Sequence, residues 1–217
     1  MNGFIYTVYS TDGKPNKFFK DEFLVSHASL KKVLPKCNTT LYTNIEFKNK
    51  YGISNVIYDK DIPKTHIAKA EALLRSPYKK TVFLDTDTYI HKPAIRRLFG
   101  VLDEFDFTCC YGNNWNSGSL YPDFNTGLIG VKNNDFTKRE IMGWMADFNN
   151  GKTASDQKAF RSIFMRNKIR FHVLPAYFMH RWQHLRSYPD QAVLTHSHTM
   201  SKKHVTSKTI KIWSETC

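Results

Sequence analysis

The sequence predicts an α/β fold with a mainly parallel central sheet flanked by helices. Short runs of apolar and β-branched residues alternate with longer segments whose apolar residues recur at helical spacing. The first half of the chain has the order strand, helix, strand, strand, helix, strand. Three apolar residues in succession, Val82 to Leu84, are typical of a strand buried on both faces of a parallel sheet. We therefore expect one domain over residues 1–217, which leaves open whether the chain is part of a longer multidomain protein.

The individual elements follow from the same patterns. Strands are expected at 4–9, 40–43, 56–58, 81–84, 106–111, 124–131, 171–174 and 192–194. Helices are expected at 18–34, 67–75, 94–102, 137–148 and 156–166. A capping box formed by Thr137 and Glu140 is expected to begin the fourth helix. Because ligands bind beyond the carboxyl ends of parallel strands, Ser10, Asp59 and Asp85 are expected to border one crevice.

Composition narrows the choice of partners and compartment. Lysine and arginine exceed aspartate and glutamate by 13, which suggests nucleic acid, a membrane surface or a phosphorylated small molecule as partner. No apolar run is long enough for a transmembrane helix, and the N-terminus lacks the pattern of a secretory signal. The four cysteines form no CxxC pair, so we expect reduced thiols and a cytoplasmic protein.

Two carboxylates follow the buried strand directly, at Asp85 and Asp87. No basic residue within this segment offsets them, so they would repel each other unless a cation lay between them. Carboxylate oxygens suit Mg²⁺ or Mn²⁺, whose further ligands are often phosphate oxygens. The alternative is a turn whose acids are solvated or cap the next helix. No GxGxxG follows the first strand and no GxxxxGK[ST] occurs, which disfavours a dinucleotide site and a P-loop.

Five features in this order resemble the GT-A-fold glycosyltransferases that use nucleotide-sugar donors. The nearest likeness is to the compact glycogenin/galactosyltransferase-like groups and to small microbial or viral enzymes, and it spans residues 4–203. The features are a helix with Lys69, the DxD segment 78–88, the FNTG sequence at 124–127, the SDQ sequence at 155–157 and the histidine-containing segment 196–203. The family's tail pattern of Gly and Lys-Pro-Trp is missing, which leaves the register of the late histidines open.

The resemblance implies a metal site and a donor site. Asp85 and Asp87 would hold Mn²⁺ or Mg²⁺ against the donor diphosphate, with His196 or His198 as a further ligand. Asp85 would alternatively bind the ribose. The other implied donor-binding residues are Thr7, Val8 and Tyr9 at the uridine edge, Lys69, Thr86 within the DxD segment, and Lys202 and Lys203 at the phosphates. Each lysine could equally be a solvated surface residue.

The resemblance also implies a reaction. Asn125 and Asp156 would face the donor sugar or the acceptor. In an inverting enzyme Asp156, or alternatively Asp123, would deprotonate the acceptor hydroxyl. In a retaining enzyme no such base is needed, because the leaving phosphate can take the proton. The implied function is the metal-dependent transfer of a sugar from a nucleotide-diphosphate donor, with a UDP-sugar as the expected donor, to a hydroxyl of a glycan or glycoconjugate. No specific nucleic-acid partner is expected.

Two other classes compete with this interpretation. A metal-dependent nucleotidyltransferase or nuclease would use the same acid pair with a third carboxylate, for which Glu71 and Asp59 are candidates. A basic nucleic-acid-binding module would use aromatic residues interleaved with lysines. The apolar run that leads into the two acids argues against a nucleic-acid surface.

Overall fold

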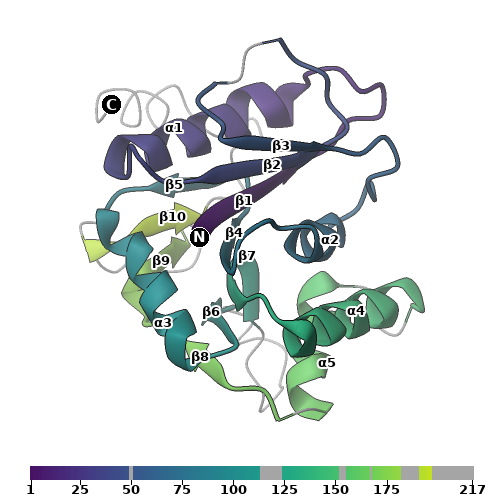
Figure 1. The fold of residues 1–217 in the computed structure, drawn as a ribbon, viewed down its shortest axis with the longest axis vertical. Helices are drawn as coiled ribbons and strands as arrows, with labels where there is room; N and C mark the ends of the chain where they lie inside the picture. Colours follow the sequence, from purple (N-terminus) through teal and green to yellow (C-terminus); the bar gives the residue numbers. More distant parts are fainter. Residues whose placement is uncertain (49–50, 113–123, 152–154, 167, 182–190, 197–217) are drawn as a thin grey trace.

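Two β-sheets and the helices around them make up the described part of the computed structural model, which comprises residues 1–48, 51–112, 124–151, 155–166, 168–181 and 191–196 (Figure 1). The larger sheet has seven strands in the order β3-β2-β1-β4-β7-β6-β8, and the smaller has three in the order β5-β10-β9. The strands of the larger sheet are β1 (Asn2–Val8), β2 (Thr39–Thr43), β3 (Asn55–Tyr58), β4 (Lys80–Leu84), β6 (Phe107–Tyr111), β7 (Phe124–Lys132) and β8 (Phe171–Val173).

The larger sheet confirms the predicted α/β class and is mixed rather than wholly parallel. Strands β3, β2, β1 and β4 run parallel to one another. Strand β7 runs antiparallel to β4 and to β6, while β8 is parallel to β6. The carboxyl ends of β1 and β4 therefore lie at one edge of the sheet, which is where an α/β sheet binds its ligands.

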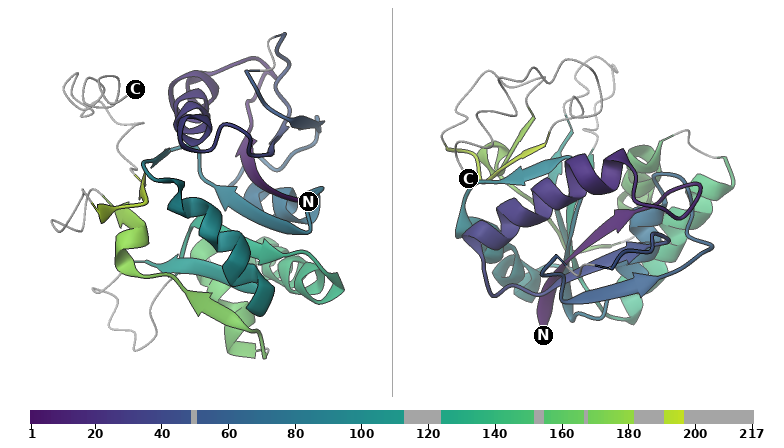
Figure 2. Two further views of the ribbon diagram at one scale, coloured as in Figure 1. Left: turned by 60° about the vertical axis from the view of Figure 1, so that its left-hand side comes forward. Right: turned by 90° about the horizontal axis from the view of Figure 1, so that it is seen from above.

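Helices cover both faces of this sheet (Figures 1 and 2). The core cluster on one face includes residues of α1 and of the segment η2–α3, and the cluster on the other includes residues of α2, α4 and α5. These elements are α1 (Leu24–Val33), α2 (Ala68–Leu74), η2 (Pro93–Arg97), α3 (Leu98–Glu104), α4 (Asp135–Asn149) and α5 (Asp156–Arg166).

The central strand β4 joins the two core clusters. Its Val82 and Leu84 belong to one cluster and Phe83 to the other, and all three side chains are buried. Successive side chains of a strand point to opposite faces, so an unbroken apolar run is required wherever both faces are covered. The prediction of a strand buried on both faces is confirmed.

The smaller sheet was only partly predicted. It contains β5 (Thr88–Ile90), β9 (Met179–Arg181) and β10 (Leu194–His196). The expected strand at 192–194 is displaced toward the C-terminus, and β5 and β9 were not expected at all. Each of these strands has three residues, too few for an alternating pattern to emerge.

Two helix starts also differ from the prediction. The expected helix at 18–34 is divided into a π-helical segment, η1 (Phe18–Phe23), and the α-helix α1. The expected capping box of Thr137 and Glu140 was wrong, because Asn134 is the capping residue of α4. The Asn134 side chain accepts a hydrogen bond from the Thr137 N–H, and the Thr137 hydroxyl accepts one from the Asn134 N–H. No helix within the described ranges is long and apolar enough to span a bilayer.

Candidate active site

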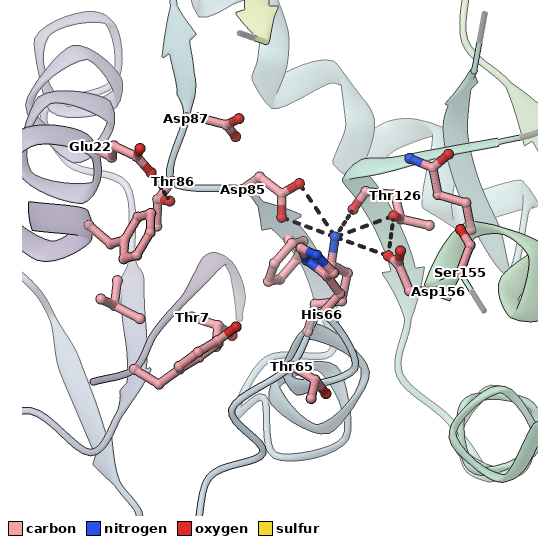
Figure 3. A pocket seen from close by; sticks show the side chains of 16 residues that line it. Thr7, Glu22, Thr65, His66, Asp85, Thr86, Asp87, Thr126, Ser155 and Asp156 are labelled. Carbon is pink, nitrogen blue, oxygen red and sulfur yellow. Dashed lines mark hydrogen bonds and ion pairs between the residues drawn. The ribbon is translucent and has the colours of Figure 1, made fainter. Parts of the chain in front are cut away.

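A cavity of about 650 Å³ opens beside the carboxyl ends of β1 and β4 (Figure 3). Its wall combines residues from the end of β1, from η1, from the start of α2, from the turn after β4, from β7 and from the start of α5. The lining residues are Thr7, Val8, Tyr9, Phe18, Glu22, Thr65, His66, Lys69, Phe83, Asp85, Thr86, Asp87, Thr126, Ser155, Asp156 and Gln157. This is the crevice that the α/β alternation predicts.

The turn between β4 and β5 presents the two acids to this cavity. The Asp85 N–H donates to the Gly127 carbonyl on β7, and the Thr88 hydroxyl donates to the Asp85 carbonyl. These bonds fix the chain on either side of Asp87 as it leaves the larger sheet and enters the smaller one. The acid pair is thus held by hydrogen bonds to residues of both sheets.

The smaller sheet brings His196 to the same point. Strand β10 pairs antiparallel with β5 so that His196 lies opposite Thr88, the residue that follows Asp87. The buried His196 Nε2 lies 3.0 Å from Asp87 Oδ1 and 3.6 Å from Asp85 Oδ2. One ligand atom from each of these three residues lies within 4.8 Å of the other two.

Gly127 leaves the space that the His196 ring occupies. A Cβ atom on Gly127 would lie 2.3 Å from Cε1 and 2.6 Å from Nδ1 of His196. Such distances are far inside van der Waals contact, so any larger residue at this position would displace the imidazole. The glycine of the FNTG strand therefore accommodates a histidine of the same chain.

A buried ion-pair network centred on Lys69 forms one flank of the cavity (Figure 3). The Lys69 ammonium lies 3.2 Å from Asp85 Oδ1 and 3.2 Å from Asp156 Oδ2, and it also contacts the Thr126 hydroxyl and carbonyl oxygens. Burial disfavours the charged ammonium, but the two carboxylates outweigh that effect and raise the pKa of Lys69. The alternative of a solvated surface lysine is therefore wrong for Lys69.

Asp156 is fixed at the start of α5 by three groups. Its Oδ2 accepts a hydrogen bond from the Thr126 hydroxyl at 2.7 Å, and its carbonyl accepts one from the Trp144 indole N–H. Burial opposes its ionisation, yet the Lys69 ammonium and the hydrogen bonds from Thr126 and Lys69 hold the pKa of Asp156 below its usual value. Asp156 is accordingly a carboxylate at neutral pH.

Glu22, on η1, is a third carboxyl group close to the acid pair. Its Oε2 accepts a hydrogen bond from the Thr86 hydroxyl at 3.0 Å, and the residue is 4 % exposed. Burial raises the pKa of Glu22 to about 7, the Thr86 hydrogen bond opposes that rise, and the Asp87 charge adds to it. Sequence reasoning missed Glu22, although a carboxyl group between the buried Phe19 and Phe23 could have signalled a functional residue.

The charge of the cavity is opposite to that of the whole chain. Among its lining residues are four carboxyl groups and one ammonium group, whereas the chain has a formal net charge of +13. A nucleotide diphosphate would be repelled from such a wall unless a divalent cation offset the carboxylates. Two carboxylates and an imidazole at these separations are a suitable set of ligands for such an ion.

Three expected site residues lie elsewhere or face away. Ser10 and Asp59 do not line the cavity, because Ser10 is hydrogen-bonded to Asn44 and Asp59 contacts Tyr42 and Arg75. Asn125 is fully buried and does not line the cavity, and its Oδ1 accepts a hydrogen bond from the Gly127 N–H. Within the described residues, the Asn125 Nδ2 atom has no hydrogen-bond partner.

The remaining expectations divide into two groups. The cavity brings together the predicted residues Thr7, Val8, Tyr9, Lys69, Asp85, Thr86, Asp87 and Asp156, with His196 directly behind the acid pair. The residues that lie outside the described part of the chain are Asp123, His198, Lys202 and Lys203. Besides Glu22, sequence reasoning missed Thr126, whose hydroxyl links Lys69 to Asp156.

Comparison with solved structures identifies the fold. The galactosyltransferase LgtC, in complex with donor and acceptor sugar analogues, superposes with a TM-score of 0.69 at 12% identity, over 99% of this chain and 94% of LgtC. The glycosyltransferase GlyE of Streptococcus pneumoniae TIGR4 gives a TM-score of 0.70 at 12% identity, over 99% of this chain and 60% of GlyE. A glycosyltransferase involved in glycosylation of the major capsid of PBCV-1 gives a TM-score of 0.57 at 14% identity, over 98% of this chain and 99% of that enzyme.

No protein-family model matches the sequence, and a comparison with curated protein sequences gives no match. The resemblance to solved structures therefore rests on three-dimensional arrangement at low sequence identity, and it shows a common fold. The chain has the GT-A fold of these glycosyltransferases, as its DxD, FNTG and SDQ segments led us to expect.

Proposed function

We propose that this protein is a metal-dependent glycosyltransferase that moves a sugar from a nucleotide-diphosphate donor, with UDP as the nucleotide, to a hydroxyl group of a glycan or glycoconjugate. The observation that carries the proposal is the convergence of Asp85, Asp87 and His196 on one point beside a cavity of nucleotide size. The glycosyltransferase fold supports the same reaction class.

The proposed metal site uses Asp85, Asp87 and His196. Carboxylates suit Mg²⁺ and Mn²⁺ alike, and the imidazole nitrogen favours the transition metal, so we infer Mn²⁺ ahead of Mg²⁺. When bound, the ion would neutralise the diphosphate and stabilise it as a leaving group. Asp85 also contacts Lys69, so the metal site and the ion-pair network share this carboxylate.

The two flanks of the cavity suit the two ends of the donor. Thr7, Val8 and Tyr9 would meet the nucleoside, for which Tyr9 offers a flat aromatic surface. On the other flank, Lys69, Thr126 and Asp156 would line the space around the sugar. The Thr7 Oγ1 atom is buried without a hydrogen-bond partner among the described residues, and a bound nucleotide would supply one.

Asp156 is proposed to face the reacting sugar, in one of two roles. As a base in an inverting reaction it would accept the proton of the acceptor hydroxyl while still paired with the Lys69 ammonium. Its lowered pKa makes it a weak base, because general bases work best when their pKa lies near the operating pH. The same feature favours the second role, a permanent carboxylate beside the positive charge that develops at the anomeric carbon. The leaving phosphate would then take the proton.

The competing nucleotidyltransferase or nuclease lacks support at the residues it requires. Its candidate third acids, Glu71 and Asp59, are both paired with Arg75 and do not line the cavity. The three solved structures compared above are glycosyltransferases.

A screen of nucleotide-sugar donors tests the proposal. We expect UDP with Mn²⁺ to raise the melting temperature, because a ligand that binds only the folded state stabilises it. We also expect slow Mn²⁺-dependent hydrolysis of at least one UDP-sugar, detected as released UDP. Stabilisation by an oligonucleotide but by no nucleotide or nucleotide sugar would contradict the proposal and favour the nucleic-acid alternative.

A further inference from the structure

Glu22 is a cavity residue that the proposed reaction does not use. It lines the wall from η1, and Thr86 is its hydrogen-bond partner in the described part of the chain, through Oε2 (Figure 3). The second carboxyl oxygen, Oε1, has no hydrogen bond within that part of the chain. The residue is 4 % exposed, and Oε1 keeps contact with the cavity, where a bound ligand would supply a hydrogen-bond donor.

The position of Glu22 is determined by its surroundings. Phe19 and Phe23, three residues before it and one after, are both buried in the core and anchor η1. Asn16 ties the start of this segment to the end of β1, because its amide donates to the Tyr9 carbonyl and its Oδ1 accepts from the Phe19 N–H. π-Helical turns are rare in proteins, and those that occur are often found at functional sites. Here the turn directs Glu22 toward the cavity.

Glu22 lies on the opposite side of the acid pair from Asp156, which is paired with Lys69 (Figure 3). Thr7 lies on the same side as Glu22 (Figure 3). The cavity wall also includes Val8, which follows Thr7 in β1, and Phe18, which is on η1 with Glu22. A donor whose diphosphate lies at the acid pair would extend its sugar toward the polar flank and its nucleoside toward the aromatic and apolar one. The ribose joins base to diphosphate and would therefore pass Glu22.

Ribose presents two neighbouring hydroxyl groups, and a carboxyl oxygen is a good acceptor for either. In dinucleotide-binding folds an acidic side chain commonly performs this task by accepting a hydrogen bond from a ribose hydroxyl. A buried acceptor also discriminates well, since an analogue that lacks the hydroxyl leaves that acceptor without a partner.

We propose that Glu22 selects ribonucleotide donors: Oε1 accepts a hydrogen bond from a ribose hydroxyl while the Thr86 hydroxyl holds Oε2. This inference rests on the proposed function, and it names a specificity residue outside the metal ligands and the Lys69 network. The bond from Thr86, which stands between Asp85 and Asp87, fixes the distance between this acceptor and the diphosphate site.

The test compares UDP with 2′-deoxy-UDP and 3′-deoxy-UDP by calorimetric titration of the full chain in Mn²⁺. We expect the wild type to bind UDP about 10- to 100-fold more tightly than at least one deoxy analogue. Glu22→Ala should lower the affinity for UDP to that of this analogue while leaving the affinity for the analogue unchanged. Glu22→Gln, which keeps an acceptor oxygen, should retain part of the preference.

Asp21→Asn is the matched control, because Asp21 is the neighbouring residue on η1, carries the same charge and is exposed. It should leave all three affinities unchanged. The inference is overturned if the wild type binds UDP without preferring it to either analogue. It is also overturned if Glu22→Ala weakens UDP and both analogues equally. In both cases the proposed function stands, whereas failure of the wild type to bind UDP at all would remove the proposed function as well.

Discussion

The two flanks of the cavity differ in how completely their polar groups are satisfied. Around Lys69, two carboxylates, a hydroxyl and a carbonyl surround one ammonium group, and the network is closed before any ligand arrives. Around Glu22, a buried carboxyl group has one hydrogen bond, and the nearby Thr7 Oγ1 has no partner among the described residues. A closed network gives rigidity, whereas unsatisfied buried groups mark the places where a ligand gains hydrogen bonds.

The acid pair lies where the two flanks meet, and changing it should produce the largest effect. We expect Asp87→Ala to abolish transfer and to weaken Mn²⁺-dependent binding of UDP by at least about 100-fold, because loss of even an outer-shell contact to a metal often reduces affinity by 10- to 100-fold. Titration calorimetry with and without Mn²⁺ measures this effect. Asp61→Ala, at an exposed aspartate outside the cavity, is the control and should behave as wild type. Wild-type turnover by Asp87→Ala would remove the metal site from the mechanism.

Removing the ion pairs of Lys69, on the closed flank, should affect stability as well as activity. Lys69→Met would leave the buried Asp156 and the half-buried Asp85 without their shared cation, which we expect to lower the free energy of unfolding by about 3–5 kcal/mol. The deficit should shrink in acid, because the stability that Lys69 confers through the lowered pKa of Asp156 is lost as that carboxyl group becomes protonated. Urea unfolding at several pH values measures it, with the exposed Lys64→Met as the control. A pH-independent loss would show that packing, rather than charge, is what Lys69 contributes.

Gly127 provides a test of how His196 is positioned. The Cβ of Gly127→Ala would overlap the imidazole ring, so we expect a loss of about 1–3 kcal/mol in stability together with weaker Mn²⁺ binding. Gly100→Ala is the control, because a Cβ there would meet nothing within 4 Å in helix α3, and alanine is the better helix former. Thermal melting and Mn²⁺ titration of both variants give the comparison. Unchanged Mn²⁺ affinity in Gly127→Ala would argue against His196 as a ligand.

Changing Glu22, on the flank that is open to a ligand, should have a smaller effect on stability, and this effect should depend on pH. The raised pKa of Glu22 means that the folded protein holds a proton which the unfolded chain releases between pH 4.5 and about 7. The stability of the wild type should therefore fall relative to that of Glu22→Gln across this range, by about 1–3 kcal/mol, and the difference should be constant above it. Denaturant unfolding in EDTA measures the slope, and the control Asp21→Asn, which retains Glu22, should still show it. Parallel pH profiles for Glu22→Gln and wild type would contradict the burial of an unpaired carboxyl group.

The sequence identified the acid pair and Lys69 on different grounds. Asp85 and Asp87 follow a short, unbroken apolar run, so the apolar pattern and the chemistry of the acids together identified them. Lys69 was identified only through family resemblance. Its burial follows from the close approach of helix α2 to the sheet, for which Ala68, Ala70 and Ala72 were an unused signal.

His196 and Glu22 show why the rest was harder to predict. The contact of His196 with the acid pair depends on the register of the three-residue strands β5 and β10, and segments so short carry almost no pattern. Glu22 depends on a π-helical turn, which shifts the face that a residue occupies relative to an α-helix. His196 therefore reaches the site through strand pairing and Glu22 through an irregular helical turn, and sequence periodicity reveals neither.

Anomalous diffraction from crystals grown with Mn²⁺ and UDP would examine the proposed metal centre most directly. A manganese peak should lie between the carboxylates of Asp85 and Asp87 and the Nε2 atom of His196, with diphosphate oxygens completing its coordination. UDP bound in the cavity with no manganese at these three residues would contradict the proposed mechanism.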